Sequence, residues 1–174
     1  MPAAHRWLAL CYTVPAEPSR SRVYVWRHLR ALCAQTVSSG FAVLPDTPEN
    51  LSAFETLAAD VRRLKGEAFL LRFDYVDEKD DRAVRERFAR AAAEEQAELL
   101  RRCAALVGRL ESGETDRAAV RELKSSLDRF EKSPLRTFSP RGSGEELARA
   151  VGEIFGTLRS LPSELSALLR RTTK

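Results

Sequence analysis

The sequence is poor in the residues that build most metal sites. It has two histidines, His5 and His28, and three cysteines, Cys11, Cys33 and Cys103. The cysteines are scattered and form no CxxC pair, so a zinc site of the usual spacing cannot be built. We therefore expect no metal site and three reduced, buried thiols, with Cys11 in an apolar strand and Cys33 on the apolar face of a helix.

The sequence also lacks the common catalytic motifs. It contains no GxGxxG and no Walker loop, so no loop is prepared to bind nucleotide phosphates. A Ser-His-Asp or Cys-His arrangement would have to use His5 or His28. His28 lies between Arg27 and Arg30 on an expected helix, a position typical of a surface imidazole. We therefore expect a protein that is not an enzyme and has no cofactor.

Long apolar runs are absent as well. No run approaches the ~18 residues needed to cross a bilayer, and residues 1–6 show no apolar signal core. With 44% hydrophobic and 31% charged residues, the 174-residue chain has the composition of a folded globular protein. We expect a cytoplasmic protein with no membrane partner.

The positive charge that gives a net charge of +4 is concentrated at the two ends of the chain. Residues 1–45 contain five arginines and one acidic residue, and residues 135–174 contain seven basic and four acidic residues. Residues 46–134 are slightly acidic. The guanidinium group suits phosphates and other oxyanions better than the lysine ammonium does, so this distribution favours an anionic partner.

The apolar pattern predicts an α+β fold that opens with a ferredoxin-like βαββαβ unit in residues 1–76. The expected elements are a strand at 6–14, a helix from Ser19 or Ser21 to Ala34, two short strands or one bulged strand within 35–45, a helix at 46–64 stopped by Gly66, and a strand at 67–76. This order of elements (strand, helix, strand pair, helix, strand) is that of the split βαβ motif when the crossovers are right-handed.

Residues 77–174 are expected to form a helical region packed on the first unit. Apolar residues at helical spacing predict a long antiparallel hairpin at 81–131, and a Pro/Ser/Gly-rich loop follows at 133–144. Terminal helices are predicted over 145–171, with Pro162 between them.

A cluster of acidic residues marks the start of this region, at Asp74, Asp77, Glu78, Asp80 and Asp81. Its spacing matches no EF-hand loop. Acidic side chains belong at a helix N-terminus, where they oppose the macrodipole, so a solvated cap is the preferred interpretation.

The arginines of the first helix are the candidate site. Arg20, Arg27 and Arg30 stand at i, i+7 and i+10 and so share one face, with Arg22 close by. They could form a solvated outer face, or they could bind the phosphates of a nucleic acid without sequence choice.

Two aromatic residues lie among these arginines. Tyr24 and Trp26 could stack on bases. A helix packed on a sheet uses such rings more often as core, so we expect both inside.

Three stretches of the chain resemble the N-terminal domain of the ChrB family of chromate-resistance regulators. Residues 7–15 read WLALCYTVP, residues 18–29 read PSRSRVYVWRHL, and residues 40–45 read GFAVLP. The resemblance runs over residues 6–130 and weakens after residue 76. It implies a cytoplasmic, chromate-responsive transcriptional regulator that associates with DNA. The family's usual second domain has no counterpart in these 174 residues, so we expect a stand-alone member or a sensing function that resides elsewhere.

The first 76 residues are also similar, more distantly, to the ferredoxin-like modules of PaaX repressors and of small CRISPR-associated nucleases. Those nucleases place a metal-binding aspartate after the aromatic residue of the first strand. Here Thr13 stands at that position, which argues against metal-assisted phosphodiester hydrolysis.

Two further partners are predicted. An oxyanion such as chromate would favour converging arginines or a helix N-terminus, and the turn Ser19–Arg22 offers both. The alternative to a DNA-associated regulator is a protein-interaction module of a stress response, in which the hairpin 81–131 forms a homodimer or docks a partner.

Overall fold

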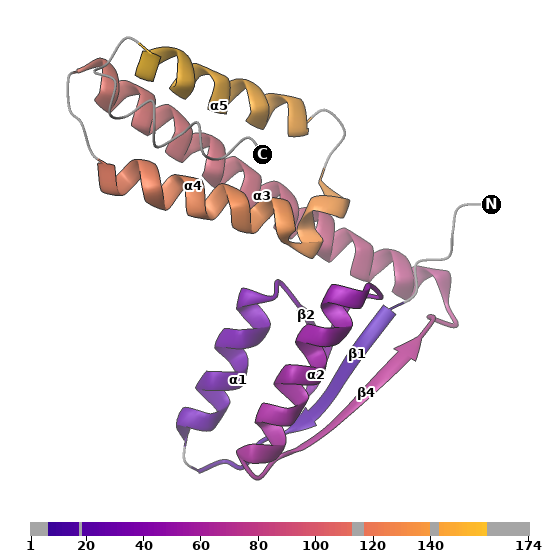
Figure 1. Cartoon of the computed structure of the whole chain (residues 1–174). Helices are drawn as coiled ribbons and strands as arrows, with labels where there is room; N and C mark the ends of the chain where they lie inside the picture. The colour runs from indigo at the N-terminus through magenta and orange to yellow at the C-terminus, as the bar shows by residue number, and fades with distance from the viewer. Residues whose placement is uncertain (1–6, 18, 113–116, 140–142, 160–174) are drawn as a thin grey trace. The chain divides into compact units, whose positions relative to one another are not determined.

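The computed structural model describes residues 7–17, 19–112, 117–139 and 143–159 of the chain (Figure 1). The elements in chain order are β1 (Trp7–Thr13), α1 (Ser19–Ala31), β2 (Gln35–Ser38), β3 (Phe41–Pro45), α2 (Pro48–Arg63), β4 (Glu67–Phe73), α3 (Glu78–Glu111), α4 (Arg117–Lys132), the 3-10 helix η1 (Pro134–Phe138) and α5 (Ser143–Arg159). This order confirms the predicted α+β fold with a helical second half. The predicted last helix, around residues 165–169, lies outside the described residues.

The chain divides into two compact units, and the division falls within α3. The first unit comprises residues 1–88 with 133–135, and the second comprises residues 89–132 with 136–174. The first turns of α3 belong to the first unit because Phe88 stacks on Trp7 of β1, with ring centroids 5.6 Å apart. The boundary expected from the sequence, after residue 76, stays a prediction.

The sheet of the first unit has the strand order β2-β3-β1-β4, with every neighbouring pair antiparallel. This is the ferredoxin-like arrangement. β1 is the better paired of the two inner strands, since Trp7 lies opposite Pro45 on one side and Phe73 on the other. The register shift between Thr36 and Ser38 settles the open question about residues 35–45: they form two strands, with an irregularity in the first.

The two faces of the sheet have different coverings. Side chains alternate along a strand, so Leu8, Leu10 and Leu44 share one face, and at most 2% of each is exposed. Helices α1 and α2 lie along this face, as Figure 1 shows. The opposite face carries Trp7 and, through the register, Phe69 and Leu71 of β4; the first turns of α3 cover it at Trp7.

Helices α1 and α2 end alike, and earlier than their apolar patterns suggest. Cys33 and Lys65 each stand two residues beyond the last helical residue, with φ of 55° and 63°. Paired hydrogen bonds close both turns: Cys33 N donates to Arg30 O and Ala34 N to Leu29 O, and Lys65 and Gly66 repeat the pattern. This is the Schellman arrangement, which usually has glycine at the left-handed position. Two expectations were therefore wrong, since Cys33 lies beyond the helix and Lys65, not Gly66, takes the conformation that ends α2.

Gly66 is needed for a different reason. A Cβ at residue 66 would lie 2.2 Å from the carbonyl oxygen of Thr13, so only glycine allows the chain to pass β1 this closely. Gly40 has φ of 73°, and a Cβ there would lie 2.3 Å from the carbonyl oxygen of Tyr12. At both glycines the backbone therefore lies in close contact with the end of β1.

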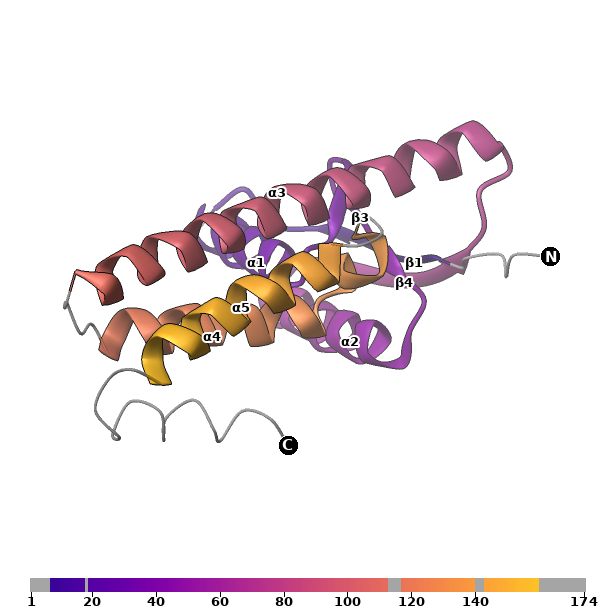
Figure 2. The same cartoon turned by 90° about the horizontal axis from the view of Figure 1, so that it is seen from above.

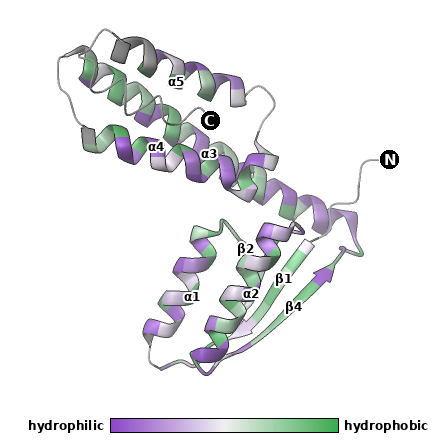
Figure 3. Cartoon of the chain, in the orientation of Figure 1, coloured by the Kyte–Doolittle hydropathy of each residue, from purple (hydrophilic) through white to green (hydrophobic). Residues whose placement is uncertain are grey.

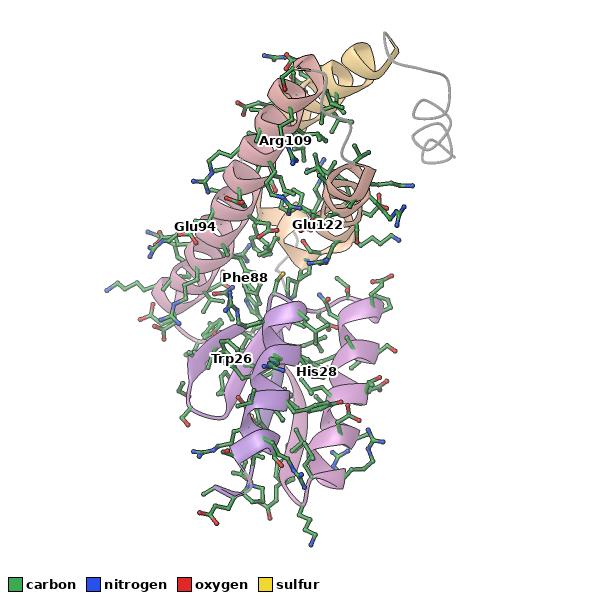
Figure 4. The ribbon with its side chains drawn as sticks, turned by 90° about the vertical axis from the view of Figure 1, so that its left-hand side faces the viewer. Trp26, His28, Phe88, Glu94, Arg109 and Glu122 are labelled. Carbon is green, nitrogen blue, oxygen red and sulfur yellow. The ribbon has the colours of Figure 1, made fainter. Side chains whose placement is uncertain are left out.

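The second unit contains the rest of α3 together with α4 and α5. Arg102 of α3 bonds to both Ser126 and Glu122 of α4, so α4 returns along α3 as the predicted hairpin requires (Figure 2). Apolar residues on α3 and α4 are buried, among them Leu99, Cys103 and Leu123. Figure 4 shows the side chains of this unit, with Arg109 and Glu122 labelled. Among the described residues, no helix combines the length and apolarity that a membrane span requires.

Candidate nucleic-acid interface

Helix α1 buries only a narrow stripe. Ser21, Val25 and Leu29, at i, i+4 and i+8, are its buried residues, and 4% or less of each is exposed. The remaining side chains of the helix are exposed. In Figure 3 the strands β1 and β4 are coloured largely as hydrophobic, whereas α1 shows several hydrophilic stretches. The helix therefore presents most of its surface to solvent.

The four predicted arginines all lie on this exposed surface, in two rows. Arg20 and Arg27 are seven residues apart and point away from the buried stripe. Arg22 and Arg30 lie on one flank of the helix. Together the four span roughly 160° of the helix circumference at about 100° per residue. Because Arg20 and Arg22 project on different sides of the helix, the two do not converge on one point.

Trp26 stands between Arg22 and Arg30 at i, i+4 and i+8, and the expectation that it belongs to the core was wrong. It is 54% exposed, and the guanidinium carbon of Arg30 lies 5.1 Å from its ring centroid. Its position on α1 is labelled in Figure 4. The buried stripe is too narrow to include Trp26, which sits about 100° around the helix from Val25. The i, i+4, i+8 spacing of arginine, tryptophan and arginine was the sequence signal that could have revealed this row.

Tyr24 is exposed as well, which also contradicts a core position, but its hydroxyl is bound. It donates a 2.6 Å hydrogen bond to the carboxylate of Asp60 on α2, and Arg63 forms an ion pair with the same carboxylate. These contacts hold the pKa of Asp60 below its usual value: the bond from Tyr24 is the largest cause, and Arg63 acts in the same direction against the effect of burial. The pKa of Tyr24 is raised, chiefly by that bond. Asp60 therefore fixes one flank of α1 against α2.

The arginines on the exposed surface of α1 have no acidic partner within the helix itself. The sequence of α1 contains no acidic residue, and its first turn carries Arg20 and Arg22 at the positive end of the helix dipole. The nearest acidic residue before the helix is Glu17. A bound anion would relieve this accumulation of positive charge.

The acidic cluster at the start of α3 caps the helix. Asp77 Oδ1 accepts a 2.8 Å bond from the backbone of Lys79, and Glu78, Asp80 and Asp81 occupy the first turn. Asp81 also accepts a 2.6 Å bond from the indole of Trp7 and a 2.5 Å bond from Arg85. Within the described part of the chain, no group of three or more His, Cys, Asp or Glu side chains is placed to hold a metal ion.

The cysteines differ from the expectation that all three are buried. Cys103 is buried, whereas Cys11 and Cys33 are half-buried. Cys33 lies in the turn after α1, and Cys11 lies on the sheet face that α1 and α2 do not cover. Burial raises the pKa of the Cys11 and Cys103 thiols, and all three are free thiols.

Fold and surface define a class: a ferredoxin-like α+β module with a basic outer helix, followed by a helical unit. A sequence model of the family described as Protein ChrB, N-terminal, matches residues 22–133, well over half of the chain. The chain belongs to the ChrB N-terminal family.

A curated relative agrees with the family match. The chain is 30% identical over 85 residues to Protein ChrB of Cupriavidus metallidurans. These residues make up 49% of this chain and 26% of the relative, so the match spans about a quarter of the relative's length. No solved structure matches the chain.

Proposed function

We propose that this protein is a cytoplasmic, DNA-associated regulatory module of a chromate-resistance system, and that it contacts duplex DNA through α1. The observation that carries the proposal is the exposed surface of α1, with four arginines around an exposed tryptophan and no acidic residue in the helix. Arginines on a rigid helix bind phosphates and position the protein on the duplex. Family membership supports the regulatory role.

The role of each residue follows from its row. Arg20 and Arg27 project outward and would bind phosphates. Arg22 and Arg30 would bind phosphates on either side of Trp26, whose ring could lie against a sugar or a base. Affinity from such contacts is electrostatic and largely independent of sequence, so the expected Kd at physiological salt is in the range of about 10⁻⁴ to 10⁻⁶ M.

Fluorescence anisotropy with a labelled duplex from the region upstream of the gene tests the interface. The logarithm of the binding constant should fall with the logarithm of salt concentration with a slope of roughly −2 to −4, about 0.9 for each phosphate contacted. Arg27→Glu and Arg30→Glu should each weaken binding about tenfold or more and reduce the slope by about 1. Arg129→Glu makes the same charge change at an exposed position of α4 and is the matched control. Equal weakening by Arg129→Glu would show that only net charge matters and would overturn the α1 interface.

Chromate dependence tests the regulatory part separately. The same titration with chromate, and with sulfate as a tetrahedral control of equal charge, should show a change in affinity with chromate alone. Binding of either oxyanion at the first turn of α1 stays a prediction. Isothermal titration of wild type and Arg22→Ala with chromate tests it, since the loss of one arginine should reduce the heat if the turn is the site.

The alternative is a protein-interaction module without enzymatic activity. Several large hydrophobic side chains are exposed among the described residues, and such side chains support association with another protein. They are Val23, Tyr24, Trp26, Val37, Phe69, Leu71 and Val76, and all belong to the first unit. The hairpin predicted as the dimer contact contributes none of them.

A further inference from the structure

The sheet of the first unit has an apolar area that its helices leave open. Phe69 and Leu71 of β4 are 62% and 48% exposed, although both project from the middle of a strand. Through the register they share a face with Cys11 and Ala9 of β1, and Phe41 of β3 lies opposite Cys11. We name Cys11, Phe41, Phe69 and Leu71 the open sheet patch.

The patch continues into the aromatic core of the unit. Phe41 and Phe73 have ring centroids 5.9 Å apart, Phe73 lies 5.0 Å from Tyr75, and Tyr75 lies 6.4 Å from Trp7. At the Trp7 end this face is closed by Phe88 of α3. The same hydrophobic layer is therefore covered at one end and exposed at the other.

The side chains of the patch itself offer no cation to a nucleic acid. Among the strand residues that project from this face, the one charged side chain is Glu67, opposite Thr13 at the far end of the strands. A phosphate backbone needs cations, and the arginines of α1 belong to the opposite side of the sheet. The arginines of α3 that reach this face contact Trp7 and β2, outside the patch: Arg85 lies over the Trp7 ring, and Arg87 donates to the carbonyl oxygen of Thr36. The partner must instead present a neutral, apolar surface.

A second copy of the chain presents such a surface. A phenylalanine presents about 150–250 Å², so the 62% exposure of Phe69 alone leaves on the order of 100 Å² of apolar area. With its neighbours the patch reaches on the order of 300 Å², which is the scale of the apolar core within a standard interface of about 800 Å² per partner. Two identical patches whose own side chains are uncharged can meet about a two-fold axis without burying a charge at its centre.

We propose that the open sheet patch is a homodimer interface, in which two sheets pack face to face and Phe69 and Leu71 insert between their counterparts. Packed sheets lie about 10 Å apart, a spacing that side chains of this size fill. Helices α1 and α2 cover the other face of each sheet, so both arginine surfaces stay outside the dimer. The interface does not depend on DNA binding.

Sedimentation velocity of the full chain at concentrations from about 1 to about 100 µM tests the proposal. Wild type should pass from monomer to dimer in this range. Phe69→Glu and Leu71→Glu should weaken dimerisation by roughly 30-fold or more, because each places a charge at the centre of the interface. Val76→Glu is the matched control, since Val76 is fully exposed and lies beyond the strand. Unchanged far-UV circular dichroism would show that all three variants fold.

Thiol labelling gives an independent readout of the same face. The rate at which Cys11 reacts with iodoacetamide should fall about tenfold or more as wild type dimerises, and should not depend on concentration in Phe69→Glu. Cys33, in the turn after α1, is the internal reference. A wild type that stays monomeric to 100 µM, or a dimer that survives both glutamate substitutions, overturns the proposal. A monomer whose Cys11 is protected at every concentration also overturns it and assigns the patch to a segment of the same chain.

Discussion

The guanidinium carbon of Arg30 lies 5.1 Å from the centre of the Trp26 ring, and the two side chains form an exposed pair on α1. A cation–π contact at an exposed site is worth roughly 0.5–1 kcal/mol, too little to explain a solvent-exposed tryptophan by stability alone. The pair holds the indole and the guanidinium side by side, one able to stack and the other to bind a phosphate. This is the geometric basis for testing α1 first.

Trp26 should report DNA binding directly through its fluorescence. The chain has two tryptophans, and Trp7 is fully buried, so a change in emission on adding duplex DNA should come from Trp26. We expect Trp26→Phe to abolish the change and to weaken binding by a few-fold, since stacking contributes about 1–3 kcal/mol per base where a base is reached. Iodide quenching of the free protein provides the control. An undiminished DNA-dependent signal in Trp26→Phe would locate the contact away from this row.

Asp60 should make the stability of the first unit depend on pH in the acid range. Its folded pKa is lowered from 3.8, so its contribution is present above that value and is lost as pH falls through the folded pKa. The difference in unfolding free energy between wild type and Asp60→Asn should therefore shrink as pH falls from about 5 to about 3. Urea unfolding measures it, with Asp128→Asn on an exposed site of α4 as control. Tyr24→Phe should remove most of the effect, because its hydroxyl is the largest cause of the shift.

Lys65→Gly should stabilise the protein. Lys65 holds φ at 63°, a conformation that costs a residue with a Cβ roughly 1 kcal/mol relative to glycine. The expected gain in melting temperature is a few degrees for a unit of this size. Lys65→Ala, which removes the side chain but keeps the Cβ, should give no gain. If both variants behave alike, the lysine side chain and not its backbone conformation determines the result.

Periodicity was enough to predict the βαββαβ order and the long helices, because each element buries a stripe or a face of regular spacing. It misplaced the ends of α1 and α2, since a left-handed Cys33 or Lys65 is set by local hydrogen bonds and not by apolar pattern. The same limit applies to α1 as a site. Its arginines could be read from the sequence. The exposure of Trp26, in contrast, depends on how narrow a stripe of α1 is buried against the rest of the unit.

The open sheet patch could not be predicted for a related reason. Phe69 and Leu71 alternate with Leu70 on β4, and an apolar run of this kind is typical of a strand covered on both faces. Which face stays open depends on where α3 crosses the sheet, and that is fixed by the stacking of Phe88 on Trp7, two residues far apart in the chain.

Phe88→Ala should test that contact and the division of the chain together. Phe88 is fully buried against Trp7, so its truncation should lower the unfolding free energy by about 3–5 kcal/mol. Ala93→Gly, at an exposed position one turn further along α3, is the control and should lower it by only about 1 kcal/mol. Near-UV circular dichroism should show a changed environment of Trp7 in Phe88→Ala but not in Ala93→Gly.

By the same argument, a fragment of residues 1–76 should unfold more readily than one of residues 1–92, because it lacks both Phe88 and the carboxylate of Asp81 that accepts the Trp7 indole N–H. Equal stability of the two fragments would show that the first unit is complete without α3.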